Sequence, residues 1–187
     1  MTQELQILKF VCDQLESAKI PYMLTGSLAS HFYAVPRMTR DIDIVIETIH
    51  LNIDRFFRMF QTDFYLTKNT IVEAIENEGM FNIIHNQFVF KIDFIIRKTS
   101  AYRLAEFQRR RRLQLNHFET WVVSLEDLIL SKLFWAKDSL SQLQLNDVKH
   151  LLAANSNIDE RYLNIWVKEL ELQALYEGVK ADGRHTS

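Results

Sequence analysis

The stretch Gly26–Ile46 reads GSLASHFYAVPRMTRDIDIVI, and its last six residues alternate two carboxylates with apolar side chains. Side chains two residues apart in a strand point to the same face, so Asp41, Asp43 and Val45 share one face and three isoleucines share the other. Apolar residues on both faces are typical of a strand that is buried on both sides. The pattern predicts a buried strand with two carboxylates on one face.

Two neighbouring carboxylates on a buried strand repel each other and lose hydration, and both effects cost free energy. A divalent cation between Asp41 and Asp43 removes both costs, and Mg²⁺ commonly binds one or two carboxylates together with substrate phosphates. The residues alone leave a second interpretation open. In it, the aspartates pair with Arg37, Arg40 or a lysine elsewhere, or lie at a solvated strand end.

The residues before this strand favour binding of a phosphate group. We expect Tyr22–Thr25 to form a short strand that ends at Gly26, where glycine permits a positive φ and a close backbone approach. We expect Ser27 to cap a helix over Leu28–Ala34, and the N–H groups at a helix start attract phosphate oxygens. The sequence therefore predicts a phosphate cradle and a carboxylate pair within one strand–helix–strand unit.

Gly26-Ser27, a spacer and then Asp41-x-Asp43 resemble the signature of the nucleotidyltransferase superfamily, which has the DNA polymerase β-like fold. The superfamily pattern includes a third carboxylate on a later strand. Asp93 matches it, inside a second apolar run. If the two strands are neighbours, the resemblance and ordinary strand spacing together place Asp93 within about 5 Å of one of the first two carboxylates.

Within the superfamily, a more specific resemblance to one group of proteins extends over roughly residues 20–152. The form Thr39-x-Asp41-x-Asp43 resembles that of abortive-infection-type nucleotidyltransferase toxins and their uncharacterised relatives. Lys132, at the end of the segment SLEDLILSK, and Asp147, in a following helical segment, resemble further motifs of these toxins. On the residues alone, Lys132 would extend its ammonium group to solvent. Asp147 would equally well pair with Lys149 or Arg161.

The resemblance implies an α+β fold, with a nucleotidyltransferase-like mixed β-sheet flanked by helices and followed by a C-terminal helical bundle. We expect residues 1–123 to form the catalytic core and residues 124–187 to form a helical region packed on it. Hydrophobic periodicity and turn residues predict the individual elements. The expected helices are Gln3–Ala18, Leu51–Phe60, Thr70–Glu78, Tyr102–Arg112, Leu125–Lys137, Gln142–Ala154 and one or two within Arg161–Val179, and the further strands are Phe64–Leu66, Met80–His85, Gln87–Ile96 and one strand or a pair within Leu113–Val123.

The resemblance also implies an activity, the transfer of a nucleoside monophosphate from a nucleoside triphosphate such as ATP to an acceptor hydroxyl. Mg²⁺ or Mn²⁺, as two ions, would be the cofactor. The implied metal ligands are Asp41, Asp43 and Asp93, and the implied catalytic residues are these three together with Lys132. The implied nucleotide-binding residues are Gly26, Ser27, Lys132 and Asp147.

The toxin likeness implies RNA, such as a tRNA end, as the acceptor and a cognate antitoxin protein as a partner. The run Arg109-Arg110-Arg111-Arg112 would contact RNA phosphates, although on the residues alone it is equally a solvated surface. A small molecule such as an aminoglycoside, a protein hydroxyl and a non-catalytic nucleotide-binding module are the alternatives. A basic groove from these arginines to Asp93 would favour RNA. Acidic residues in the acceptor pocket would favour a cationic drug, and the candidates are Asp159, Glu160, Glu169 and Glu171.

Composition sets broader limits on the protein. The chain has 187 residues, of which 48% are hydrophobic, and a net charge of −2, so nucleic-acid binding would need a local basic patch. Cys12 is the single cysteine, which excludes an internal disulfide and fits a reducing compartment. No signal peptide or membrane-spanning run is evident. We therefore expect a cytoplasmic protein with no membrane partner.

Overall fold

The structure is a computed structural model that describes residues 2–35, 41–88, 90–139 and 141–183. The strands in these ranges are β1 (Tyr22–Thr25), β2 (Asp41–Ile46), β3 (Phe64–Tyr65), β4 (Met80–His85), β5 (Lys91–Ile96), β6 (Arg111–Leu115) and β7 (Phe118–Val122). The helices are α1 (Gln3–Ser17), α2 (Gly26–Ser30), α3 (Ile53–Phe60), α4 (Lys68–Glu76), α5 (Ala101–Gln108), α6 (Leu125–Ser139), α7 (Gln142–Ala154), α8 (Glu160–Glu169) and α9 (Gln173–Gly183).

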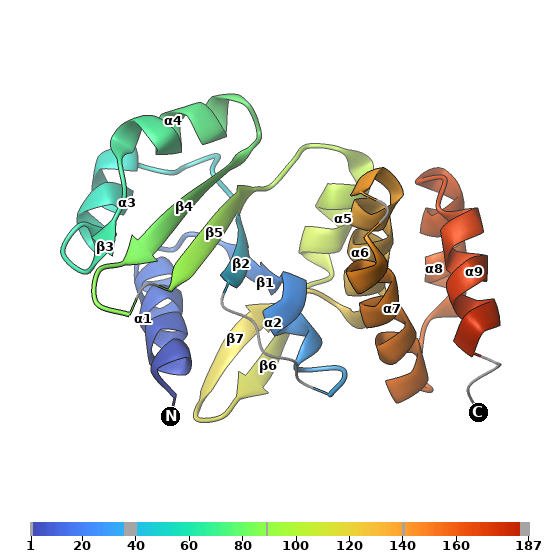
Figure 1. The fold of residues 1–187 in the computed structure, drawn as a ribbon. Helices are drawn as coiled ribbons and strands as arrows, with labels where there is room; N and C mark the ends of the chain where they lie inside the picture. Colours follow the sequence, from blue (N-terminus) through green and yellow to red (C-terminus); the bar gives the residue numbers. More distant parts are fainter. Residues whose placement is uncertain (1, 36–40, 89, 140, 184–187) are drawn as a thin grey trace.

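The described strands form one mixed sheet of seven, in the order β3-β4-β5-β2-β1-β7-β6 (Figure 1). The predicted strand of alternating carboxylates, β2, lies at the centre, antiparallel to β1 and parallel to β5. Its register pairs Asp43 with Thr25 on one side and with Asp93 on the other, and it pairs Asp41 with Lys91. The expectation that the strand of the third carboxylate neighbours β2 is therefore confirmed.

One face of the sheet packs against α1 and α3 through a cluster of phenylalanine rings. The Phe94 ring of β5 lies 5.3 Å from the Phe56 ring of α3 and 5.2 Å from the Phe81 ring of β4. Tyr22 of β1 points to the same side, where its hydroxyl lies 3.2 Å from Glu16 of α1. Cys12 is buried among these groups, and burial raises the pKa of its thiol to about 11, so it is a structural residue rather than a nucleophile.

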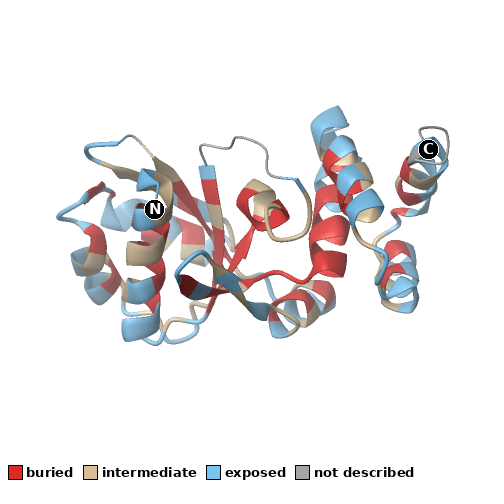
Figure 2. Ribbon diagram, turned by 90° about the horizontal axis from the view of Figure 1, so that it is seen from below, coloured by how far each residue is buried: buried red, intermediate tan, exposed pale blue. Residues whose placement is uncertain are grey.

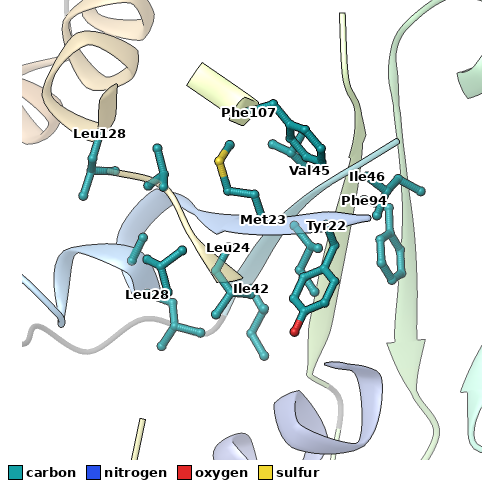
Figure 3. Close-up of a cluster of buried hydrophobic side chains, with 14 of the residues drawn as sticks. Tyr22, Met23, Leu24, Leu28, Ile42, Val45, Ile46, Phe94, Phe107 and Leu128 are labelled. Carbon is teal, nitrogen blue, oxygen red and sulfur yellow. The ribbon is translucent and has the colours of Figure 1, made fainter. Parts of the chain in front are cut away.

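The opposite face of the sheet holds the carboxylates and packs against α5 and α6. Met23 and Val45 are register partners on β1 and β2. Figure 3 shows them pointing to the side where Phe107 of α5 and Leu128 of α6 lie, while Tyr22 points the other way. This face is fully covered near Met23, and it opens toward the ends of β2 and β5 where the aspartates lie.

The helices α6–α9 stand together at the side of the molecule away from α3 and α4 (Figure 1). Buried residues run through the strands and α6, and exposed residues lie on the outer faces of the flanking helices (Figure 2). The start of α6 follows the predicted capping pattern, because Ser124 Oγ accepts a bond from the Asp127 backbone N–H at 3.2 Å and donates to its carboxylate at 2.6 Å. These observations confirm the α+β fold with a mixed sheet and C-terminal helices, and the division at residue 123 stays a prediction.

Several sequence-based boundaries are wrong, and two of them concern residues singled out for function. The helix predicted over Tyr102–Arg112 ends at Gln108, because Arg111–Leu115 pairs with Phe118–Val122 as a β-hairpin. The helix after Gly26 is also shorter than predicted. It begins at Gly26 with Thr25 as its N-cap residue, so Ser27 lies within the first turn and does not cap it. At the first boundary, strand pairing within the adjacent hairpin takes the residues that the sequence assigned to the helix.

Among the described residues, no helix has the length and apolarity that crossing a membrane requires.

Candidate functional site

Three carboxylates and a lysine meet where β2 and β5 lie side by side. Asp43 and Asp93 are register partners on the same face of the parallel pair. The Lys91 Nζ lies 2.8 Å from Asp93 Oδ2 and 3.9 Å from Asp41 Oδ1. A lysine partner was one of the open alternatives for the aspartates, and Lys91 is that lysine. The other proposed partners, Arg37 and Arg40, and the motif residue Thr39 lie outside the described residues.

The electrostatics of this group favour a bound cation. Burial, together with the nearby charges of Asp93 and Asp41, raises the pKa of Asp43 to about 6. Asp93 as a whole residue is 5% exposed, and its Oδ1 is buried without a hydrogen-bond partner among the described residues. A buried oxygen that receives no hydrogen bond costs free energy unless a cation or proton occupies it. The site chemistry therefore fits a divalent metal ion with oxygen ligands.

The described His, Cys, Asp and Glu side chains do not, however, form a ready-made group of three metal ligands. The Lys91 ammonium contacts two of the three carboxylates. The hydrogen bond to Asp93 raises the pKa of Lys91. A lysine ammonium thus supplies the positive charge at this site in the structure.

Gly26 lies directly against the carboxylate of Asp43. Its φ is +66°, and a Cβ at this position would lie 1.9 Å from Asp43 Oδ2. Only glycine fits both the backbone conformation and the space. This is the predicted close backbone approach, and it makes the α2 turn one wall of the carboxylate site.

A cavity of about 510 Å³ opens from these residues. At one end it is lined by Gly26, Ser27, Asp43 and Asp93. Its apolar lining comes from the strands and from the exposed side of α6, where Trp135 is 59% exposed. The apolar lining residues are Val45, Met80, Ile95, Ile96, Leu128, Phe134 and Trp135. The cavity therefore joins a charged end to an aromatic and aliphatic end.

Lys132 lines the same cavity from α6 and pairs with Asp147 of α7. The Lys132 Nζ lies 2.6 Å from Asp147 Oδ2 and 3.3 Å from Gln144 Oε1. Both charged side chains are buried, at 4% and 8% exposure, so the alternative that Lys132 extends to solvent is wrong. Lys149, one of the suggested partners of Asp147, pairs with Asp182. The structure thus brings together the two helical motif residues that the sequence singled out.

A second buried polar group borders the cavity and was missed from the sequence. Arg103 donates to both carboxylate oxygens of Glu106 at 2.9 Å and to Ser131 Oγ at 2.7 Å. Ser131 in turn donates to Glu106 at 2.6 Å. The i,i+3 spacing of Arg103 and Glu106 on one helix is the signal that could have found the pair. Lys91 was also missed, although it lies two residues before Asp93 on the same face of its strand.

The arginines of the run make different contacts, and Arg110 and Arg112 both lie over the Trp121 ring. Arg109 bonds to Asp127 and Glu126, each at 3.2 Å, and its guanidinium lies 3.8 Å from the Tyr162 ring centroid. Arg112 pairs with Glu119 at 3.0 Å. None of the four arginines is among the described residues that line the cavity, and none of the four acidic candidates from the C-terminal helices is either. The two features expected to distinguish RNA from a cationic drug are therefore both absent from the described cavity lining.

A central parallel strand pair with three carboxylates, a glycine turn against them and helices α6–α9 beyond the sheet together make up a nucleotidyltransferase-like fold. No protein-family model matches the sequence, and no curated protein matches it either. The fold assignment therefore rests on solved structures.

Three of these structures are similar over most of their length. An antigenic nucleotidyltransferase-like protein from Paracoccidioides brasiliensis has 16% identity and a TM-score of 0.56, with 94% of this chain and 91% of that chain covered. A putative nucleotidyltransferase from Thermotoga maritima has 17% identity and a TM-score of 0.54, over 76% and 92%. The antibiotic-resistance factor ANT(2'')-Ia has 12% identity and a TM-score of 0.53, over 97% of each chain. At these identities the likeness shows the fold, and the toxin likeness stays a prediction.

Proposed function

We propose that this protein is a metal-dependent nucleotidyltransferase that moves a nucleoside monophosphate from a nucleoside triphosphate to an acceptor hydroxyl. The observation that carries the proposal is the register of β2 and β5, which places Asp43 beside Asp93 with Gly26 packed against the carboxylate. A buried Asp93 oxygen without a hydrogen bond from the described residues, together with the raised pKa of Asp43, supports a cation at this place.

Asp41, Asp43 and Asp93 would hold Mg²⁺ or Mn²⁺, in the proposal as two ions. The metal supplies positive charge for the oxygens of the transferring phosphate. The acceptor oxygen forms a bond to the α-phosphorus while the bond from that phosphorus to pyrophosphate breaks. In the proposal, Asp93 also takes the acceptor proton.

The remaining site residues bind the triphosphate. The Gly26 backbone and the Ser27 hydroxyl line the charged end of the cavity and are proposed to hold the β- and γ-phosphates. Lys132 faces the same cavity and would neutralise phosphate charge. Asp147 does not line it, so its proposed role is to position the Lys132 ammonium through their 2.6 Å contact.

For the acceptor, the structure favours a small molecule with an apolar or planar face. The cavity has about 510 Å³ and an aromatic end, which is a usual size and lining for a small-molecule site. The likeness to ANT(2'')-Ia, solved in complex with adenylyl-2''-tobramycin, supports a small acceptor, at 11% identity and a TM-score of 0.51. The RNA acceptor depended on four arginines, none of which lines the described cavity, and Arg109, Arg110 and Arg112 contact carboxylates or aromatic rings.

The test is transfer of label from each α-labelled nucleoside triphosphate, with Mg²⁺, to a panel of small hydroxylated compounds and, separately, to total cellular RNA. We expect label on a small acceptor with the wild type and none with Asp41→Ala, while Asp63→Asn, an exposed aspartate outside the site, serves as the matched control. If label appears in RNA alone, the acceptor is RNA and not a small molecule. Nucleotide binding without any transfer would identify a non-catalytic binding module.

A further inference from the structure

Lys91 has a place in the site that the proposed chemistry does not use. It begins β5, pairs in register with Asp41 and shares a strand face with Asp93. Its ammonium is 2.8 Å from Asp93 Oδ2 and 3.9 Å from Asp41 Oδ1. One cation therefore contacts two of the three carboxylates that the proposed metal ions need.

The two partners of the Lys91–Asp93 ion pair differ in their exposure to solvent. The Asp93 side chain is 7% exposed, whereas the Lys91 side chain is 38% exposed. A lysine has a flexible four-carbon stem, so its ammonium can leave a carboxylate without moving the backbone. Lys132, the other cation near these carboxylates, is held by Asp147 and is almost fully buried. Among the described residues, the partly exposed cation that contacts these carboxylates is thus Lys91.

We propose that Lys91 is a built-in counter-cation of the carboxylate site, which neutralises Asp93 and Asp41 until a divalent metal ion displaces its ammonium. The inference rests on the proposed metal-dependent function. Lys91 is then a positioning residue, since it holds the Asp93 carboxylate in place and sets the metal concentration at which the site fills.

Two measurable consequences follow from this competition. Lys91→Met keeps the apolar stem and removes the charge, so Mn²⁺ no longer competes with an ammonium and should bind roughly tenfold more tightly. Without metal, the same variant has three carboxylates with less compensating charge, so its Tm should fall by roughly 3 °C. Added Mn²⁺ should reverse that loss.

Lys98 provides the matched control. It lines the same cavity and forms no ion pair among the described residues, so Lys98→Met removes the same charge without freeing a carboxylate. Lys91→Arg provides a second variant that keeps the charge, and it should bind Mn²⁺ no more tightly than the wild type. In an Asp93→Asn background, the gain from Lys91→Met should shrink, because the contested ligand is gone.

The experiment is a titration with Mn²⁺ followed by electron paramagnetic resonance, with thermal unfolding in chelator and in Mn²⁺ for each variant. Tighter binding by Lys91→Met, but not by Lys98→Met or Lys91→Arg, supports the proposal. Equal or weaker binding by Lys91→Met, in a wild type that binds Mn²⁺, overturns it and leaves the proposed function intact. If no variant binds Mn²⁺, the metal-dependent function fails and the counter-cation role fails with it.

Discussion

The buried pair of Lys132 and Asp147 yields the sharpest prediction about stability and function together. Its charged atoms are 2.6 Å apart, and both side chains are less than a tenth exposed. Removing one partner from a buried ion pair leaves the other charge in a poorly solvated place, which typically costs about 3–5 kcal/mol. We therefore expect Lys132→Met or Asp147→Leu alone to lower the free energy of unfolding by about that amount.

The double variant separates the structural role of the pair from its functional role. Replacing a buried pair by apolar side chains of similar volume is often neutral or stabilising. Lys132→Met with Asp147→Leu should therefore recover most of the stability lost by each single variant. It should not recover nucleotide binding, because the cavity then lacks the cation proposed to face the triphosphate.

Urea unfolding monitored by circular dichroism measures the stability of the four proteins, and calorimetry with a nucleoside triphosphate measures binding. Unchanged m-values would show that the free energies are comparable. If the single variants lose less than about 1 kcal/mol, the argument from burial is refuted. If the double variant binds nucleotide as well as the wild type, Lys132 has no role in binding the triphosphate.

The other predictions concern single positions. Gly26→Ala forces a Cβ to within 1.9 Å of the Asp43 carboxylate at a φ of +66°, so urea unfolding should show a loss of about 2 kcal/mol and calorimetry a loss of metal binding. The pKa of Asp43 is raised to about 6 in the metal-free folded protein, whereas the unfolded chain releases this proton near pH 4. The folded state therefore binds a proton that the unfolded state has lost, and the stability that this proton provides is lost as the pH rises through 6. Asp43→Asn should thus exceed the metal-free wild type in free energy of unfolding by up to about 3 kcal/mol at pH 7, with the difference vanishing by about pH 4. Trp135→Ala, at a residue 59% exposed in the cavity, should change stability by less than about 0.5 kcal/mol but raise the KM for acceptor or nucleotide several-fold in steady-state assays. Arg109→Met removes bonds to two buried carboxylates, so thermal unfolding should show that the free energy of unfolding falls by about 2–4 kcal/mol. A variant that keeps its stability and loses only an RNA-dependent activity would contradict the structural role of Arg109.

Much of the core could be predicted from local patterns. The alternation in DIDIVI identified β2 and the face of its aspartates, because strand periodicity depends only on neighbouring residues. The helices of the C-terminal region followed from their apolar spacing, and Gln142–Ala154 was predicted with both ends correct. The arginine run was assigned to the wrong element because a helix end and a strand start share it. Arg109 is the C-cap of α5, and Arg111 begins β6, which pairs with β7 directly after it.

The sequence by itself identified the candidate residues of the site: Gly26 in a turn, three aspartates on apolar strands, and Lys132 and Asp147 on helices. Residue type and periodicity, which are local properties, identified the first motif, and the resemblance to the superfamily added Asp93, Lys132 and Asp147. Only the tertiary structure decided which of these groups meet. The parallel register of β2 and β5 brings Asp43 beside Asp93 and Lys91 within reach of two carboxylates. The packing of α7 on α6 turns Asp147 toward Lys132 rather than toward its sequence neighbours. Ion-pair energies depend on distance and burial, and both are set by contacts between segments far apart in the chain.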